Sequence, residues 1–253
     1  MQRAWLLLVI TGLIIGLIWW QRPADGQLEE MVPADLAGLV MVNRFPDSLD
    51  FLPQTRLGEW LNDDAGLFKA RLAEQAEGEW FSVLKESLER ACLVVHTLEQ
   101  KESGAYRPHV TAYLWPLSGR SAAVEEWIQT KVVERFGVDR TTIVQEGAVR
   151  VFRGEAVGEV LYLSHERGYL IVSNSESGWK NVQLALAGRA PNLGERRSYK
   201  DVRNRIDQDI DLFFYFSGAV AHSLLPEFGY GVRVDKDQVT DLYWEVPPGE
   251  QRN

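Results

Sequence analysis

The side chains best suited to metal binding or nucleophilic chemistry in this 253-residue chain are four histidines and a single cysteine. No two of the histidines have the spacing of a zinc-binding pair; they are His96, His109, His165 and His222. Because Cys92 is the only cysteine, neither an intramolecular disulfide nor a thiolate metal cluster can form. It precedes an apolar run at 93–95, which favours a buried, unreactive thiol over one that cross-links two chains. The sequence therefore predicts neither a metal nor a cofactor.

Ser164, His165 and Glu166 place three catalytic residue types in a row. Consecutive residues of a strand point to opposite faces of a sheet, so these side chains cannot form a catalytic relay. We predict the end of a β-hairpin at this position.

Three aspartates spaced two residues apart resemble the start of a calcium-binding loop; they are Asp207, Asp209 and Asp211. Such a loop needs glycine at its sixth position and glutamate at its twelfth, where this chain has Leu212 and Gly218. The aspartates are therefore predicted to form a charged turn before a strand.

Tryptophans spread over the chain offer aromatic surfaces of the kind that bind sugars; they are Trp60, Trp80, Trp127, Trp179 and Trp244. Trp80, Trp127 and Trp179 fall on apolar stripes of predicted helices, which favours core packing over a glycan-binding groove. The sequence also lacks glycine-rich phosphate-binding motifs and the Gly-x-Ser-x-Gly motif. We predict no catalytic residue and no enzymatic activity.

The elements that position these residues follow a charge-free run at the start of the chain. Ala4 to Trp20 comprises seventeen residues, in which Thr11 is the only aliphatic polar side chain. As a helix the run covers roughly 25 Å of the ~30 Å hydrocarbon core of a bilayer. Trp5 at one end, and Trp19 and Trp20 at the other, are suited to the headgroup regions. We predict a transmembrane anchor.

The anchor divides the chain into a cytoplasmic tail (1–3), the transmembrane helix (4–20), a connector (21–31) and an extracytoplasmic domain (32–253). The short tail favours a cytoplasmic amino terminus, which places the domain on the extracytoplasmic or periplasmic side of the cytoplasmic (inner) membrane. A cleaved signal peptide is the alternative, because Ala24 and Gly26 form a weak cleavage site before Gln27. The length of the apolar run favours an uncleaved signal anchor.

Gly12 and Gly16 form a Gly-x-x-x-Gly pair inside the anchor. This spacing lets two helix backbones approach closely, although glycine is also common in membrane helices in general. We therefore hypothesise that the chain forms a homodimer through this helix face.

Composition limits the partners of the domain. Apolar residues make up 45% of the chain, enough for a sizeable core. Without Arg3 the chain has 26 basic and 36 acidic residues, a net charge of −10. This balance argues against binding to nucleic acid or to an anionic lipid surface, because both require basic patches. The only local basic cluster, Arg189 to Arg205, is interleaved with Glu195 and Asp201 and is predicted to be a solvated face.

Short apolar runs and alternating patterns predict an antiparallel sheet. The predicted strands are 36–42, 92–98, 109–115, 142–145, 148–153, 159–164, 169–173, 212–216, 232–234 and 239–246. In the strand 109–115, residues 110, 112 and 114 are predicted to face one side of the sheet and residues 111, 113 and 115 the other. A turn is predicted around Pro226 and Gly229, and the last two strands are predicted to be edge-like. Helical spacing and capping residues predict helices over 63–72, 80–91, 121–137, 175–188 and 198–206. The predicted amino-terminal caps are Ser121, Ser175 and Ser198, and the predicted helix ends are Gly137 and Gly188. Together these elements predict an α+β domain with helices packed on the sheet.

Two segments of the chain are similar in sequence, Asp35–Asn43 and Asp209–Ser217. Each is followed by an apolar pair and a proline, at 51–53 and 224–226. The repeat predicts two related halves, 32–140 and 141–253, with the second half truncated.

The order of several motifs resembles that of a known family. A membrane anchor is followed by Val32–Asp35 leading into a strand, then by Gly168–Ser175 running into a helix, and by Ser198–Val202 before the next strand. Over most of residues 30–220 the chain resembles a large bacterial family of membrane-anchored extracytoplasmic proteins classed as a domain of unknown function. The resemblance implies an α+β fold on the outer face of the cytoplasmic membrane and brings no catalytic residues. This chain differs from the family in its second half, which ends early.

We expect a non-catalytic interaction or scaffold protein of the bacterial envelope, whose anchor holds it near protein partners in the same membrane. The alternative is an envelope enzyme or a small-ligand receptor whose site assembles from residues far apart in the sequence.

Overall fold

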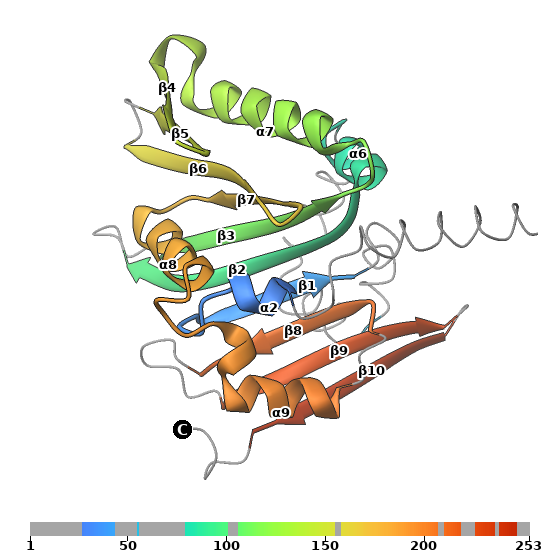
Figure 1. Cartoon of the computed structure of the whole chain (residues 1–253). Helices are drawn as coiled ribbons and strands as arrows, with labels where there is room; N and C mark the ends of the chain where they lie inside the picture. The colour runs from blue at the N-terminus through green and yellow to red at the C-terminus, as the bar shows by residue number, and fades with distance from the viewer. Residues whose placement is uncertain are drawn as a thin grey trace, which may run out of the picture.

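The computed structural model of the chain shows a large, twisted antiparallel sheet with helices on both of its faces (Figure 1). The structure describes residues 27–43, 55, 79–100, 106–154, 158–206, 210–218, 226–235 and 238–246. The predicted α+β class is confirmed. The predicted anchor and the predicted helix over 63–72 lie outside the described residues.

Within the described residues the strands form one ten-stranded sheet, in the order β10-β9-β8-β1-β2-β3-β7-β6-β5-β4. The strands are β1 (Gly38–Val42), β2 (Leu88–Gln100), β3 (Tyr106–Pro116), β4 (Thr141–Glu146), β5 (Val149–Gly154), β6 (Glu159–Glu166), β7 (Tyr169–Ser173), β8 (Leu212–Phe216), β9 (Phe228–Asp235) and β10 (Gln238–Glu245). Every pair of neighbours is antiparallel, and β10 and β4 form the two edges.

The helices divide between the two faces of the sheet (Figure 1). One face carries α2 (Gln27–Met31), α8 (Glu176–Leu186), the short 3-10 helix η3 (Leu193–Glu195) and α9 (Arg197–Arg205). The other face carries α6 (Glu79–Ser87) and α7 (Ser121–Phe136), and the 3-10 helix η2 (Val138–Arg140) follows α7.

Alternation along each strand supplies apolar side chains to cores on both faces of the sheet, because consecutive side chains point to opposite faces. In β7, Tyr169 and Ile171 join the core under α2, α8 and α9, whereas Leu170 joins the core under α7. The alternation predicted for β3 is confirmed, since Tyr113 belongs to the first core and Leu114 packs against the second. Strands in this part of the sheet are therefore buried on both faces, which explains why β7 is almost wholly apolar.

The two similar segments of the sequence lie side by side, because β1 pairs with β8. Val40 lies opposite Phe214, and Gly38 lies opposite Phe216. A Cβ atom on Gly38 would come within 2.8 Å of the Tyr215 carbonyl oxygen, so the close approach of these strands requires glycine.

Two of the predicted helix ends are confirmed. Ser175 caps α8, and its hydroxyl accepts a hydrogen bond from the Gly178 amide at 3.0 Å. Gly137, with φ of +90°, ends α7.

The prediction that Ser121 and Ser198 cap their helices is wrong. Both serines lie inside the first turn, and the cap positions hold Arg120 and Arg196, neither of which makes a side-chain capping bond. The Ser198 hydroxyl instead donates to the Glu227 carboxylate, a partner far away in the sequence.

The predicted helix over 80–91 is wrong at its carboxyl end. α6 ends at Ser87, and Leu88 already belongs to β2. Leu88 is buried under α7, and Ala91 pairs with Val42 of β1. Apolar residues at these two positions fit a helical stripe as well as a strand, so pairing with β1 and β3 decides the outcome.

Glycines in β9 allow α9 to lie close to the sheet. A Cβ atom on Gly229 would come within 2.1 Å of Val202 Cγ1, and one on Gly231 within 2.6 Å of Ile206 Cγ2. The predicted turn around Gly229 is therefore wrong, because this glycine serves helix packing inside a strand. β9 was also predicted to be edge-like, but it lies between β8 and β10.

Candidate functional site

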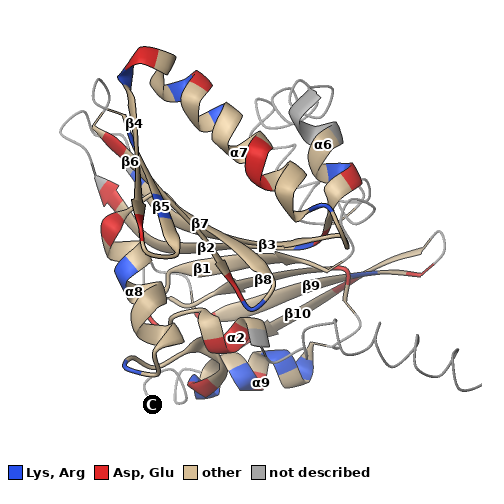
Figure 2. Cartoon of the chain, turned by 45° about the horizontal axis from the view of Figure 1, so that its top comes forward, with Lys and Arg blue, Asp and Glu red and all other residues tan. Residues whose placement is uncertain are grey.

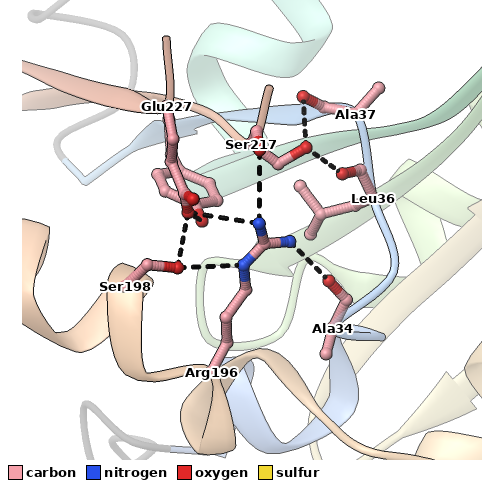
Figure 3. Close-up of polar contacts among 8 residues, drawn as sticks. Ala34, Leu36, Ala37, Arg196, Ser198, Ser217 and Glu227 are labelled. Atoms are coloured by element: carbon pink, nitrogen blue, oxygen red, sulfur yellow. Dashed lines mark hydrogen bonds and ion pairs between the residues drawn. The ribbon is translucent and has the colours of Figure 1, made fainter. Parts of the chain in front are cut away.

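Arg196, at the start of α9, joins three segments that are far apart in the sequence (Figure 3). Its Nη1 donates to the Ala34 carbonyl oxygen at 3.1 Å, and its Nη2 donates to the Ser217 carbonyl oxygen at 3.2 Å. Nη2 also forms an ion pair with Glu227 Oε1 at 3.2 Å. The guanidinium thus connects the segment before β1, the end of β8 and the start of β9.

The Glu227 carboxylate accepts further hydrogen bonds inside this cluster. Ser198 Oγ donates to Oε1 at 2.6 Å (Figure 3). The Tyr215 hydroxyl donates to the same oxygen. Burial raises the pKa of Tyr215, and the hydrogen bond to Glu227 raises it further, so the phenol stays protonated as a donor. Because Glu227 is only 2% exposed, the cluster fixes backbone segments and offers no carboxylate to a substrate in solvent.

The cluster holds the stretch of chain nearest the predicted anchor. Met31, Val32 and Leu36 of this stretch are fully buried. The Tyr113 hydroxyl donates to the Met31 carbonyl oxygen at 3.1 Å, and the Leu193 amide donates to the Val32 carbonyl oxygen at 2.7 Å. α2 lies within the range predicted as a connector, and it is part of the core.

A second buried polar cluster lies beneath the amino terminus of α8. His96 Nε2 lies 2.8 Å from Thr111 Oγ1, whose hydroxyl donates to Ser173 Oγ at 3.0 Å. Because the Thr111 proton is directed to Ser173, Nε2 of His96 carries the proton that Thr111 accepts. The other ring nitrogen, Nδ1, is buried and has no hydrogen-bond partner among the described residues.

His96 is uncharged at neutral pH. Burial lowers its pKa to about 4, against the opposing effect of the Asp35 carboxylate and with a smaller contribution from His109. A His–Thr–Ser chain contains the residue types of a proton relay. However, His96 is 7% exposed, and Thr111 and Ser173 are completely buried. These three hydrogen-bonded side chains therefore contribute to the packing of the sheet against α8.

A cleft of about 440 Å³ opens between the carboxyl-terminal half of α7 and the starts of β3 and β6. Its apolar lining includes Val132, Phe136 and Leu161. Arg135 and Glu159, which also line the cleft, form a bidentate ion pair with distances of 2.9 and 3.2 Å. Arg107 lines the cleft without an ion pair to any described residue. The lining of the cleft therefore combines apolar side chains with the cationic side chain of Arg107.

The other histidines lie at separate places. His109 Nε2 lies 3.1 Å from a Glu99 carboxylate oxygen, and His222 lies outside the described residues. His165 Nε2 lies 2.8 Å from a carboxylate oxygen of Glu125 on α7. Ser164 is buried and points to the opposite face of β6, so the predicted hairpin end between β6 and β7 is confirmed.

Two further sequence predictions concern Cys92 and the three aspartates. Cys92 is buried as predicted, and burial, with the nearby Glu29 carboxylate, raises the pKa of its thiol. Asp211 precedes β8 as predicted, but it is buried, and its Oδ2 accepts a hydrogen bond from the Val234 amide at 2.6 Å. The aspartates at 207 and 209 lie outside the described residues. Among the residues that are described, no group of three His, Cys, Asp or Glu could hold a metal ion.

The tryptophans that the structure describes pack in or against the cores, as predicted. Trp179 stacks on Tyr162, with ring centroids 5.9 Å apart. Trp127 packs against the core under α7. Trp244 packs against the core on the other face, and the Arg205 guanidinium lies 4.7 Å from its ring centre. Residue 60 and the side chain of residue 80 lie outside the described part of the chain.

The site residues predicted in the anchor, Trp5, Trp19, Trp20, Gly12 and Gly16, lie outside the described residues. In the ranges that the structure does describe, no helix has both the length and the apolar character needed to cross a bilayer.

Sequence reasoning missed both the Arg196–Glu227 pair and the cleft with Arg107. One signal for the pair was present, since Glu227 stands between an apolar run with proline and Phe228, where an unpaired charge is costly. No sequence pattern indicates the cleft, because the residues that line it come from several segments that are distant in the sequence. Comparisons with protein family models, curated proteins and solved structures find no match to this chain.

Proposed function

We propose that this protein is a single-pass, membrane-anchored interaction or scaffold module of the bacterial envelope, with its domain on the extracytoplasmic side and no catalytic activity. The observation that carries the proposal is the charge-free run from Ala4 to Trp20, because a helix that is apolar on all sides is costly in water. The resemblance to the bacterial membrane-anchored family supports the same location. Burial of Met31, Val32 and Leu36 supports a short, firmly attached tether.

The proposal includes two related halves of the domain. From the β1–β8 pair the sheet continues as β1-β2-β3 on one side and as β8-β9-β10 on the other, and a helix, α2 or α9, precedes each set in the chain. α6 lies between β1 and β2, without a counterpart between β8 and β9 among the described residues. In the β1–β8 pair, Val40 lies opposite its aligned residue Phe214, which gives a local two-fold relation between the strands. This arrangement supports an origin of the sheet in a repeated unit.

The exposed edge of β4 supports binding of a protein partner. Among the described strands, β4 pairs only with β5. Ile143 is 51% exposed and Val144 is 37% exposed, so both sides of this edge strand present apolar groups. Edge strands of a sheet are common sites of pairing with a strand of another protein.

Photo-cross-linking in intact membranes tests this proposal. A benzophenone amino acid placed at Ile143 is expected to form an adduct with an envelope protein. The same group at Val138, which is 76% exposed on η2 and outside the sheet, serves as the matched control and is expected to form none. Absence of any protein adduct at Ile143, with the chain present in the membrane, would remove the support for partner binding at this edge.

A small-ligand receptor is the second candidate function, and the cleft beside α7 favours it. If the cleft binds an anion, a small molecule co-purifies with the detergent-solubilised chain and is seen by native mass spectrometry. Arg107→Glu is expected to abolish this species, and Arg140→Glu, at an exposed position on η2, to retain it. A chain that carries no small molecule in any form would count against this candidate.

A further inference from the structure

The basic helix α9 lies beside the helix to which the predicted anchor is attached (Figure 2). The Tyr199 hydroxyl of α9 donates to Glu29 Oε1 of α2 at 3.2 Å, and both helices pack on the same face of the sheet. Against the single acidic residue Asp201, α9 carries the basic residues Arg197, Lys200, Arg203 and Arg205.

These cations are not neutralised by carboxylates of the described residues. Arg197 and Lys200 are exposed and form no ion pair within the described part of the chain. The Arg203 guanidinium lies 4.9 Å from the ring centre of Phe213, and that of Arg205 stacks on the ring of Trp244. Aromatic contacts of this kind fix an arginine in place and leave its charge intact.

Of the acidic side chains beside α9, one is paired with a basic residue of another element, and Glu29 of α2 accepts the hydrogen bond from Tyr199. Glu30 of α2 forms an ion pair with Arg167 at 2.7 Å. Glu195 of η3 accepts a hydrogen bond from Asn192 Nδ2 at 3.2 Å. The outward side of α9 is therefore a local positive surface on a strongly acidic domain.

The length of the chain limits how far α2 can lie from the bilayer. From residue 20, the last of the predicted span, to residue 27, the first of α2, the chain has seven peptide units. At full extension these cover at most about 25 Å. α9, in contact with α2, therefore lies within reach of the headgroups of any bilayer that holds the anchor.

We propose that α9 is the surface on which the domain rests against the anionic lipid headgroups of its own membrane. The proposal rests on the proposed anchor and adds an orientation to it. With a net charge of −10, the part of the chain that follows the predicted anchor is repelled as a whole by an anionic surface, and this repulsion favours orientations that turn the basic helix toward the lipid. The net negative charge of the chain therefore does not prevent contact between this helix and anionic lipid.

The test uses the full chain reconstituted into vesicles of neutral lipid, with or without one quarter anionic phosphatidylglycerol. Cys92 is buried, so a fluorophore can be attached at an introduced cysteine, Asn204→Cys on the exposed side of α9 or Val138→Cys as the distant control. Quenching by a spin label on the lipid headgroups reports contact. We expect quenching at position 204 in anionic vesicles, a decrease with added salt, and none at position 138.

Charge-neutralised variants provide the second arm. Each basic residue near an anionic surface contributes roughly fivefold to the bound population. Arg197→Gln with Lys200→Gln is therefore expected to lower the ratio of contacting to free domain by about 25-fold. Arg120→Gln with Arg140→Gln removes the same charge from exposed positions at the ends of α7 and η2, and is expected to leave quenching at position 204 unchanged.

The outcomes distinguish failure of the proposed α9 contact from failure of the proposed anchor. A chain that stays in the bilayer through an alkaline wash but shows no quenching at position 204 would overturn the α9 contact and leave the anchor standing. Equal losses in the two neutralised pairs would also overturn it, because the effect would then follow total charge. Release of the intact chain by the alkaline wash would overturn the anchor and the α9 contact together.

Discussion

Protonation of His96 is expected to destabilise the folded domain in mild acid. In the unfolded chain this imidazole has its ordinary pKa of 6.5, and in the folded chain burial lowers the pKa to about 4. The unfolded state therefore binds a proton at His96 over a range of pH in which the folded state does not. The contribution of the neutral ring to stability is complete above pH 6.5 and is lost progressively as the pH falls to about 4.

The size of the loss follows from the difference between the two pKa values. One unit corresponds to about 1.4 kcal/mol, so His96 is expected to cost the folded state roughly 3 kcal/mol between pH 6.5 and pH 4. The structure gives the reason, because Nδ1 is buried without a partner and a second ring proton would have no acceptor there. The Asp35 carboxylate raises the pKa of His96 and His109 lowers it, and both effects are smaller than that of burial.

Equilibrium unfolding of the full chain in detergent micelles, followed by tryptophan fluorescence, measures this loss at several pH values. His96→Gln is the matched variant, because its amide can donate to Thr111 and does not titrate. Other groups titrate equally in both proteins, so the difference between the two stability curves isolates His96. Parallel curves from pH 7 to pH 4 would refute the burial of a neutral imidazole at this position.

Three further predictions concern packing, the buried ion pair and the anchor. Gly229→Ala places a methyl group against Val202 and is expected to destabilise the domain by about 1–3 kcal/mol, measured as a lower midpoint of urea unfolding; an unchanged midpoint would contradict the close packing of α9. Glu227→Ala leaves the Arg196 guanidinium without its ion-pair partner and is expected to cost roughly 3 kcal/mol, whereas the double change of both residues to Met is expected to cost less than the two single changes added together. Gly12→Ile is expected to lower the fraction of dimer in detergent, and a dimer fraction that does not change would remove the hypothesis of a helix-dimer face.

Strands with strong local patterns were predictable from the sequence. β7 and β8 have the predicted bounds, 169–173 and 212–216, because apolar runs bounded by turn residues identify buried strands without tertiary information. The two caps that involve close neighbours, Ser175 and Gly137, were also predictable, since their partners lie within one turn. These elements supply the frame of the α+β domain.

Features that depend on distant residues were not predictable. Ala34 and Arg196 are 162 positions apart, and no local pattern indicates that their atoms meet. The same holds for Gly229, where an apparent turn glycine serves the packing of α9. Leu88 was assigned to a helix because its spacing fits a helical stripe, and only pairing with β3 places it in a strand.

The basic residues between Arg189 and Arg205 are interpreted differently from the sequence and from the structure. In the sequence, Arg197 and Lys200 are interleaved with acidic residues and read as a solvated face. In the structure they lie on one exposed helix beside α2, and Glu30 is paired with Arg167. Net charge is an average over the surface, whereas the potential near a helix depends on which charges remain unpaired.

The most direct test of the account is whether the intact chain stays in a lipid bilayer. Membranes from expressing cells are washed with alkaline carbonate, and mass spectrometry verifies that residues 1–20 are present in the recovered protein. We predict that the chain remains in the membrane pellet and is released only by detergent. Intact protein that appears in the carbonate supernatant would contradict it.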